Sequence, residues 1–305
     1  MQDLLGGRGA IVTGGARGIG LAISQTLAML GARVLIVDNG AALDGAAEDP
    51  AVTELAVERV PGAIGLARDI GAEGVAHEAV ETALRAFGAL DIVINNAAIE
   101  CDAPIESARR DDFERMLRTN LVAPFALAAA AVPVLREQAR AGRSPGAVVN
   151  LVSSVGLYGR PGRPGEAASK AGLVGLTRSL AQELGAARIG CNAIAPFAGT
   201  RALRAIPDGD AALEAFRDRT LPLPPSDVAQ LVAFLCSPQA AGITGQVFGV
   251  RGREVFVWSA SRPAQSCFQP RAFDADEYAS ALRGLRAGFT GLDDDASAFR
   301  NDPIA

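Results

Sequence analysis

The sequence predicts a doubly wound α/β fold built around one seven-stranded parallel sheet. Short apolar runs bounded by Gly, Asp or Asn alternate along the chain with longer helical stretches. This alternation is typical of a parallel sheet that carries helices on both faces. Connections between parallel strands are almost always right-handed, so few topologies fit seven such strands.

The individual elements follow from these runs. The expected strands cover residues 10–13, 34–38, 63–67, 92–95, 147–151, 190–195 and 246–250. The expected helices cover residues 19–30, 51–60, 72–87, 111–138, 166–184 and 226–237. The Pro- and Gly-rich stretch 160–165 is predicted to be a mobile connector before a helix.

We expect a single domain over residues 1–251 and a C-terminal extension over residues 252–305, because the composition changes near Gly252. In the extension, residues 255–258 suggest an added edge strand, residues 259–272 an irregular segment and residues 274–287 a helix. The run Asp293-Asp294-Asp295 is expected to begin a polar terminus.

Composition excludes several classes of function. A hydrophobic fraction of 49% supplies a large core, and a net charge of −5 argues against a nucleic-acid partner. The N-terminus has neither a basic flank nor an apolar run, and no uncharged apolar stretch suits a membrane span, so we expect a cytoplasmic protein. The four cysteines are widely spaced, which predicts no disulfide and no metal site. The single histidine, His77, is expected at the surface of a helix, so a Ser-His-Asp hydrolase is excluded.

A glycine-rich turn follows the first expected strand and precedes the first expected helix. Its residues are Gly14, Gly15, Ala16, Arg17, Gly18, Ile19 and Gly20. Glycines here allow a tight turn and the approach of a pyrophosphate to amides at the helix N-terminus, as in Rossmann-type folds. Asp38 ends the second strand, about 20 residues further on, where a carboxylate accepts hydrogen bonds from the adenosine ribose. Because that carboxylate would repel a 2′-phosphate, NAD is favoured over NADP, although Arg17 is a residue type that often accompanies NADP.

The spacing TGGARGIG resembles the TGxxxGIG turn of the short-chain dehydrogenase/reductase family, and further motifs across residues 8–250 resemble that family too. The resemblance implies an adenine-side contact from Asp69 and Ile70 and a strand-end element in Asn96, Ala97 and Ala98, with Ala98 in place of the usual glycine. It also implies cofactor contacts from Gly14, Arg17, Gly18, Ile19, Gly20, Lys170, Pro196, Gly199 and Thr200.

The family resemblance implies a catalytic Asn, Ser, Tyr and Lys, of which one is replaced here. Asn120, Ser153 and Lys170 match, but Glu166 stands at the Tyr position four residues before Lys170. A carboxylate beside an ammonium is held ionised and is a poor acid, although it is still able to act as a base. Tyr158, expected in a loop near the pocket, is a candidate replacement acid, with packing against the substrate as the competing interpretation.

The stretches 153–159 and 189–201 resemble the (3R)-hydroxyacyl-CoA dehydrogenase units of multifunctional β-oxidation enzymes and their bacterial relatives. This resemblance implies a small-molecule substrate such as a long or steroid-like acyl-CoA. Three interpretations stay open: an NAD-dependent oxidoreductase whose proton is handled by Glu166, Ser153, Tyr158 or water; a non-redox lyase, hydratase or isomerase with Glu166 as base; and a cofactor-binding pseudoenzyme.

The family resemblance also implies a homodimer or a higher homo-oligomer. Helices 111–138 and 166–184 are expected to pack across a two-fold axis, where small side chains would allow close approach. The small residues are Ala126, Ala128, Ala129 and Ala130. The extension after Val250 is expected to cover the surface that many relatives use to form a tetramer, or to reach the pocket of the partner.

Overall fold

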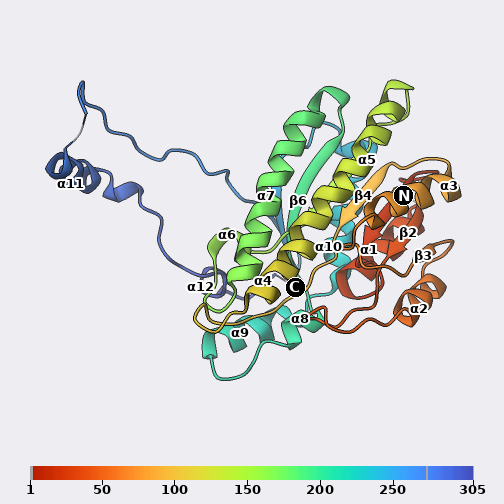
Figure 1. Cartoon of the computed structure of the whole chain (residues 1–305), viewed down its shortest axis with the longest axis horizontal. Helices are drawn as coiled ribbons and strands as arrows, with labels where there is room; N and C mark the ends of the chain where they lie inside the picture. Colours follow the sequence, from red (N-terminus) through yellow and green to blue (C-terminus); the bar gives the residue numbers. More distant parts are fainter. Residues whose placement is uncertain (1–2, 273, 305) are drawn as a thin grey trace.

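A computed structural model of the chain describes residues 3–272 and 274–304, so residues 1–2, 273 and 305, which fall within the predicted domain and extension, lie outside it. Its centre is one sheet in the order β3-β2-β1-β4-β5-β6-β7-β8 (Figure 1). The strands are β1 (Gly9–Thr13), β2 (Arg33–Val37), β3 (Ile64–Leu66), β4 (Ile92–Asn95), β5 (Ala147–Leu151), β6 (Gly190–Phe197), β7 (Val247–Arg251) and β8 (Glu254–Val257). All neighbours are parallel except β8, which pairs antiparallel with β7. The predicted sheet and the added edge strand are therefore confirmed.

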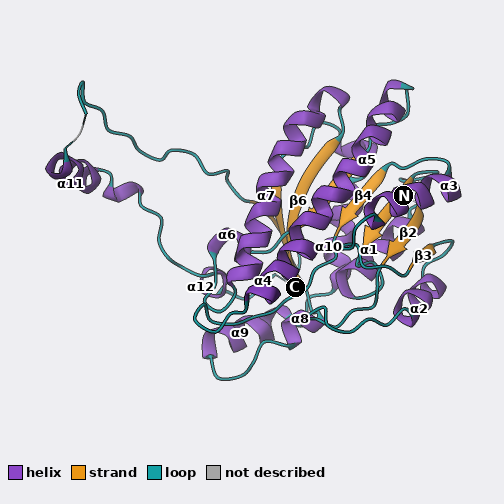
Figure 2. Cartoon of the chain, in the orientation of Figure 1, coloured by secondary structure: helices purple, strands orange, loops and turns teal. Residues whose placement is uncertain are grey.

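Helices cover both faces of the sheet (Figure 2). On one face, α1 and α10 pack together over a core that includes Ile23, Leu27 and Val232. On the other face, α3 and α5 pack over Ile11, Leu35 and Val93. The helices of the sheet domain are α1 (Gly18–Met29), α2 (Ala51–Arg59), α3 (Val75–Phe87), α4 (Arg110–Leu117), α5 (Ala123–Arg140), α6 (Val155–Tyr158), α7 (Pro164–Leu184), α8 (Arg201–Arg204), α9 (Ala211–Thr220) and α10 (Pro225–Leu235).

The helix predicted over residues 111–138 is interrupted. A π-helical turn, η1 (Arg118–Val122), separates α4 from α5, and Asn120 lies on it. Such turns are rare and often occur at functional sites. By length and composition alone, the whole stretch Arg110–Arg140 is apolar enough to cross a membrane, but 39% of its most apolar window is buried inside this fold. A buried helix of the core passes the same test.

The C-terminal extension leaves the sheet domain and returns to it. After β8, an irregular arm carries α11 (Ala275–Gly284) away from the body, and α12 (Asp295–Ala298) lies back against it (Figure 1). Ile304 then forms a bridge with Gly252. The prediction of a polar terminus from Asp293 onward is wrong at Asp295, which is fully buried, whereas Asp293 is exposed. Short polar runs lack the periodicity that would reveal such a buried acid.

Candidate active site

A cavity of about 300 Å³ opens at the carboxyl ends of the parallel strands. The strand order reverses between β1 and β4, and ligands of doubly wound folds bind at such a switch point. Residues from six strand ends, as well as from η1, α7, α8 and α9, line this cavity. It therefore collects residues from almost the whole length of the chain, from Gly14 to Asp295.

The glycine turn between β1 and α1 forms one wall of the cavity. Gly14 and Gly18 have φ angles of +61° and +53°, which favour glycine, and a Cβ at Gly20 would lie 2.0 Å from the carbonyl oxygen of Gly14. Without side chains, the turn exposes backbone amides at the N-terminus of α1. This cradle fits the pyrophosphate of a dinucleotide.

Asp38 lies at the next strand end and lines the same cavity. Its carboxylate accepts hydrogen bonds from the amides of Ala16, at 3.1 Å, and Gly40, at 2.8 Å, which fix it beside the glycine turn. Arg17 and Arg201 both donate to the carbonyl oxygen of Ala41, at 2.6 and 2.9 Å. The carboxylate of Asp38 thus has two guanidinium groups near it. The sequence pointed to Arg17 as one of them but not to Arg201.

Asn96, Ala97 and Ala98 lie where predicted, beside the glycine turn. The side-chain amide of Asn96 is used within the protein: it donates to the carbonyl oxygens of Thr13 and Gly14, at 3.0 and 2.9 Å. Ala97 packs tightly here, since a Cβ at Gly14 would lie 2.7 Å from its Cα atom. Asn96 and Ala97 therefore shape the turn.

The remaining predicted cofactor contacts divide into two groups. One group lines the cavity: Arg17, Gly18, Ile19, Asp69, Ile70, Lys170, Pro196 and Thr200. Gly199 does not belong to that group. Its position is explained by packing instead, because a Cβ there would lie 2.1 Å from the carbonyl oxygen of Leu221.

Asn120 is buried behind the cavity wall. Its carboxamide accepts from the amide of Ile99 and donates to the carbonyl oxygen of the same residue, both at 2.9 Å. The π-helical turn directs the side chain at this strand end. Asn120 is thus a positioning residue that fixes the backbone between Ala98 and Glu100, both of which line the cavity.

Ser153 and Lys170 line the cavity on its far side from the glycine turn. The ammonium group of Lys170 donates to the carbonyl oxygen of Leu151 at 2.9 Å, and its side chain is almost completely buried. Burial lowers the pKa of Lys170, while the nearby carboxylates of Glu166 and Glu100 oppose that shift. Ser153 precedes the short helix α6, and its hydroxyl accepts a hydrogen bond from the amide of Val155 at 3.2 Å.

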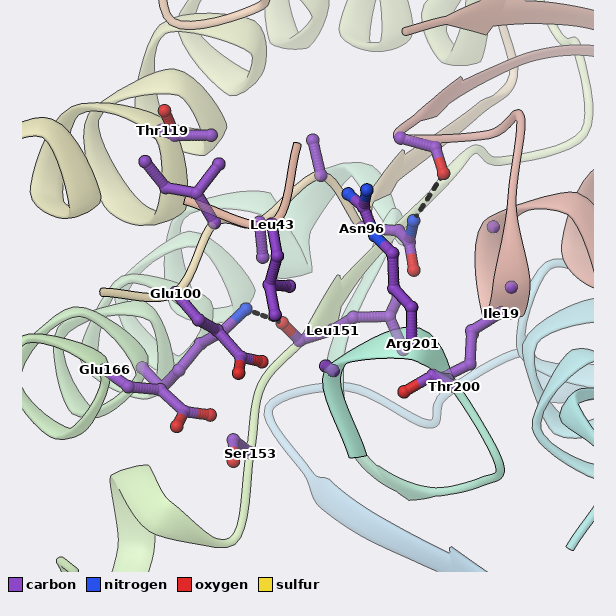
Figure 3. A pocket seen from close by; sticks show the side chains of 18 of the residues that line it. Ile19, Leu43, Asn96, Glu100, Thr119, Leu151, Ser153, Glu166, Thr200 and Arg201 are labelled. Carbon is purple, nitrogen blue, oxygen red and sulfur yellow. Dashed lines mark hydrogen bonds between the residues drawn. The ribbon is translucent and has the colours of Figure 1, made fainter. Parts of the chain in front are cut away.

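Glu166 lies in the first turn of α7 and is only 5% exposed. Its carboxylate accepts from Arg163 at 2.8 Å, and Figure 3 shows it pointing toward the same space as the carboxylate of Glu100, beside Ser153. Arg163 also forms ion pairs with Glu100, at 3.5 Å, and with Asp102, at 2.6 Å. The connector predicted at residues 160–165 does lead into a helix, because Pro164 already starts α7, and Arg163 within it is paired with three acids.

Tyr158 does not reach the cavity. It ends α6 and is 42% exposed, and its ring packs edge-on against Phe299 with the centroids 6.0 Å apart. The prediction that it overlooks the pocket is wrong, because residues 155–158 form a helical turn that directs the ring toward the C-terminal segment. Of the two interpretations, packing fits this position.

The returning C-terminal segment holds the loop that carries Ser153. Asp295 accepts two hydrogen bonds from Arg160, both at 2.7 Å, and one from the hydroxyl of Ser154 at 2.6 Å. The guanidinium of Arg160 also lies over the ring of Phe216, 5.0 Å from its centroid. We call Ser154, Arg160 and Asp295 the C-terminal clasp. It connects the extension to the floor of the cavity.

Comparisons with known proteins show the family of the chain. Residues 14–252 match the profile of the family described as Enoyl-(Acyl carrier protein) reductase. The chain belongs to the short-chain dehydrogenase/reductase family. It is 34% identical to Hydroxyacyl-CoA dehydrogenase ChsB1 of Mycobacterium tuberculosis over 292 residues, which cover 93% of this chain and 90% of that protein.

Two solved structures are also similar. A short chain dehydrogenase from Mycobacterium avium superposes with a TM-score of 0.79 at 29% identity, covering 93% of this chain and 96% of that one. The 3-ketoacyl-(acyl-carrier-protein) reductase from Brucella melitensis, solved with NADH, gives a TM-score of 0.72 at 31% identity, covering 82% of this chain and 98% of that one.

Sequence reasoning missed several residues of the site. Glu100, Arg163 and Arg201 line the cavity, and Asp295 joins it from the other end of the chain. Glu100 stands only two residues after Ala98, which was a signal that it also follows a strand end. For Asp295 the sequence offered no such signal, because its partner Arg160 is 135 residues away.

Proposed function

We propose that this protein is an NAD(H)-dependent oxidoreductase that interconverts the 3-oxo and 3-hydroxy forms of an acyl thioester, with CoA as the preferred carrier. One observation carries the proposal: the glycine turn, Asp38, Ser153 and Lys170 line a single cavity. The named activities of the Mycobacterium tuberculosis and Brucella melitensis relatives support the substrate class.

The residues of the chain divide the work of binding and orientation. The amides of the glycine turn hold the pyrophosphate, and Asp38 accepts hydrogen bonds from the adenosine ribose. The buried ammonium group of Lys170, fixed by the carbonyl oxygen of Leu151, orients the nicotinamide end of the dinucleotide. The bound dinucleotide supplies or accepts a hydride at the substrate carbon.

The substrate oxygen is placed beside the hydroxyl of Ser153, which donates a hydrogen bond to it. The acyl part follows an apolar wall formed by Leu203, Ile206 and Phe216. Such a wall accepts a long or ring-containing chain and excludes water from the reacting carbon. This is the basis for preferring bulky acyl groups, including steroid-like ones.

We also propose that the active form is a homodimer through α5 and α7. Val122, Phe125 and Ala129 are exposed on the outer face of this layer. Two of the residues expected there face inward instead: Ala128 and Ala130 are buried in the core of their own chain. The exposed apolar side chains, rather than a continuous alanine stripe, support the interface.

The decisive experiment follows NADH oxidation with a panel of 3-oxoacyl-CoA esters of increasing chain length, and the reverse reaction with 3-hydroxyacyl-CoA esters and NAD. The proposal predicts turnover that increases with acyl length and is slower with NADPH. If the protein hydrates or isomerises a 2-enoyl-CoA without consuming NADH, the carboxylate-base interpretation replaces this one. If it binds NADH but converts nothing, it is a pseudoenzyme.

A further inference from the structure

The proposed reduction needs a proton donor, and the residue at the usual Tyr position is a carboxylate. Beside it the structure places a second carboxylate that motif matching did not find. Glu100 and Glu166 both line the cavity and both contact Arg163, whose Nη2 atom lies 3.5 Å from Glu100 and whose Nη1 atom lies 2.8 Å from Glu166. Figure 3 shows their carboxylates directed toward one space beside Ser153.

Three acids contact a single guanidinium beside this pair. Three acids, Glu100, Asp102 and Glu166, surround the buried guanidinium of Arg163, and the ammonium of Lys170 is the other cation close to the pair. Arg201 on α8 contributes a weaker positive field at Glu100. If all three acids were ionised, two of the negative charges would face each other inside the cavity wall.

Glu100 is the acid least able to remain ionised. Its Oε2 atom is buried and, although it lies 3.5 Å from Nη2 of Arg163, it has no hydrogen-bond partner among the described residues. The pKa of Glu100 is raised to about 7, first by burial and then by the neighbouring Glu166, while the charges of Arg163 and Lys170 oppose the shift. Adding one proton removes both the cost of burying an ionised oxygen that has no hydrogen bond and the repulsion between the two carboxylates.

We propose that Glu100 and Glu166 share one proton, and that this carboxyl pair is the acid that protonates the substrate oxygen. The pair resembles two carboxyl groups that cannot both ionise at close range, so one remains protonated at neutral pH. A donor with a pKa close to the working pH is the most effective general acid.

The step is balanced within the proposed reaction. The carbonyl carbon gains a hydride from reduced dinucleotide, the π pair of the C=O bond takes the shared proton on oxygen, and the products are the alcohol and the oxidised dinucleotide. The pair is left as two carboxylates facing Arg163 and Lys170, and it regains a proton from solvent through the cavity. In the oxidation direction the ionised pair accepts the alcohol proton.

The shared proton is testable without cofactor or substrate. Infrared difference spectra of the dinucleotide-free protein, recorded across neutral pH, should show one protonated carboxyl band that titrates near neutrality. The band should disappear in Glu100→Gln, and in Glu166→Gln, which removes the like charge but leaves Glu100 buried, it should titrate at lower pH. Asp102→Asn is the matched control, because Asp102 contacts the same guanidinium but is 39% exposed and does not line the cavity, so the band should remain.

Kinetics then test the role of the pair, which rests on the proposed function. Glu100→Gln should reduce kcat for 3-oxoacyl-CoA reduction about a hundredfold near neutral pH while NADH binding is unchanged, and Asp102→Asn should change kcat less than about threefold. In a Glu166→Tyr background, where a phenol donates the proton, Glu100→Gln should have little effect.

The possible results separate the two proposals. A Glu100→Gln protein with wild-type kcat and pH profile, or a wild type without the titrating band, would overturn the shared proton. An equal loss from Glu100→Gln in both backgrounds would assign Glu100 a structural role. A titrating band without turnover of any thioester would overturn the proposed function and the donor role, but it would leave the shared proton intact.

Discussion

The C-terminal clasp makes a quantitative prediction about how the extension supports the site. Asp295→Asn keeps the shape of the side chain but removes the charge that neutralises Arg160. The two side chains are 1% and 4% exposed, so the guanidinium would remain buried without a counter-ion. Breaking one partner of such a pair costs about 3–5 kcal/mol.

The loss of stability cannot exceed the free energy that holds the extension on the sheet domain, because beyond that point the extension detaches. If the clasp contributes less than the broken pair costs, residues 295–304 detach while the sheet domain stays folded. The hydroxyl of Ser154 and the ring of Phe216 then lose their contacts with this segment and with Arg160. We therefore expect kcat for thioester reduction to fall together with protection of the extension.

The assay combines urea unfolding with amide hydrogen exchange over residues 259–304. Asp295→Asn should lower the free energy that protects α12 by about 3 kcal/mol or detach it completely. Asp294→Ala is the matched control, since it removes only the cap on Ser297 and should cost about 1 kcal/mol. An Asp295→Asn protein with wild-type exchange in α12 would refute the reasoning.

Four further outcomes are expected. Glu166→Tyr should raise reductase kcat at alkaline pH, where the carboxyl pair has lost its proton, and an unchanged kcat there would argue against a missing donor. Asp38→Ala should narrow the difference in affinity between NADH and NADPH in calorimetric titration. Tighter binding of NADPH than of NADH to the wild type would contradict this and would show that Arg17, rather than Asp38, decides the cofactor preference. The folded-state pKa of Glu100 lies above its unfolded value, so ionising Glu100 destabilises the fold, with no effect below about pH 4.5 and the full effect above about pH 7. Glu100→Gln should therefore increase the free energy of urea unfolding by about 3 kcal/mol more at alkaline pH than at acid pH. An equal change at both pH values would contradict this. Phe125→Glu should shift the dimer toward monomer in sedimentation measurements, and an unaffected dimer would place the interface elsewhere.

The sheet was predictable because its signals are local. Each strand is a short apolar run that ends at a turn residue, and the TGGARGIG turn fixes the first β-α connection by spacing alone. Ser153, Lys170 and Glu166 were likewise placed by counting along the chain, and all three line the cavity. The spacing of residues within one motif can be read directly from a single sequence.

What the sequence could not predict depends on contacts between distant segments. Asp295 was read as part of a solvated acidic run, because its neighbours Asp293 and Asp294 have the same side chain and only the fold distinguishes them. Arg163 lies in a Pro- and Gly-rich stretch, and this composition suggested flexibility. Composition does not show the ion pair that Arg163 forms with Glu100, because that contact exists only in the folded chain. The pairing of Glu100 with Glu166 joins residues 66 positions apart, and no periodicity marks it.

The pH dependence of kcat/KM for NADH-driven reduction of a long-chain 3-oxoacyl-CoA tests the central claim most directly. If the protein is a reductase whose carboxyl pair supplies the proton, the wild type turns over, and kcat/KM falls about tenfold for each pH unit above the pKa of the pair, near neutrality. No turnover at any pH, or a rate that stays constant into alkaline solution, would contradict the account.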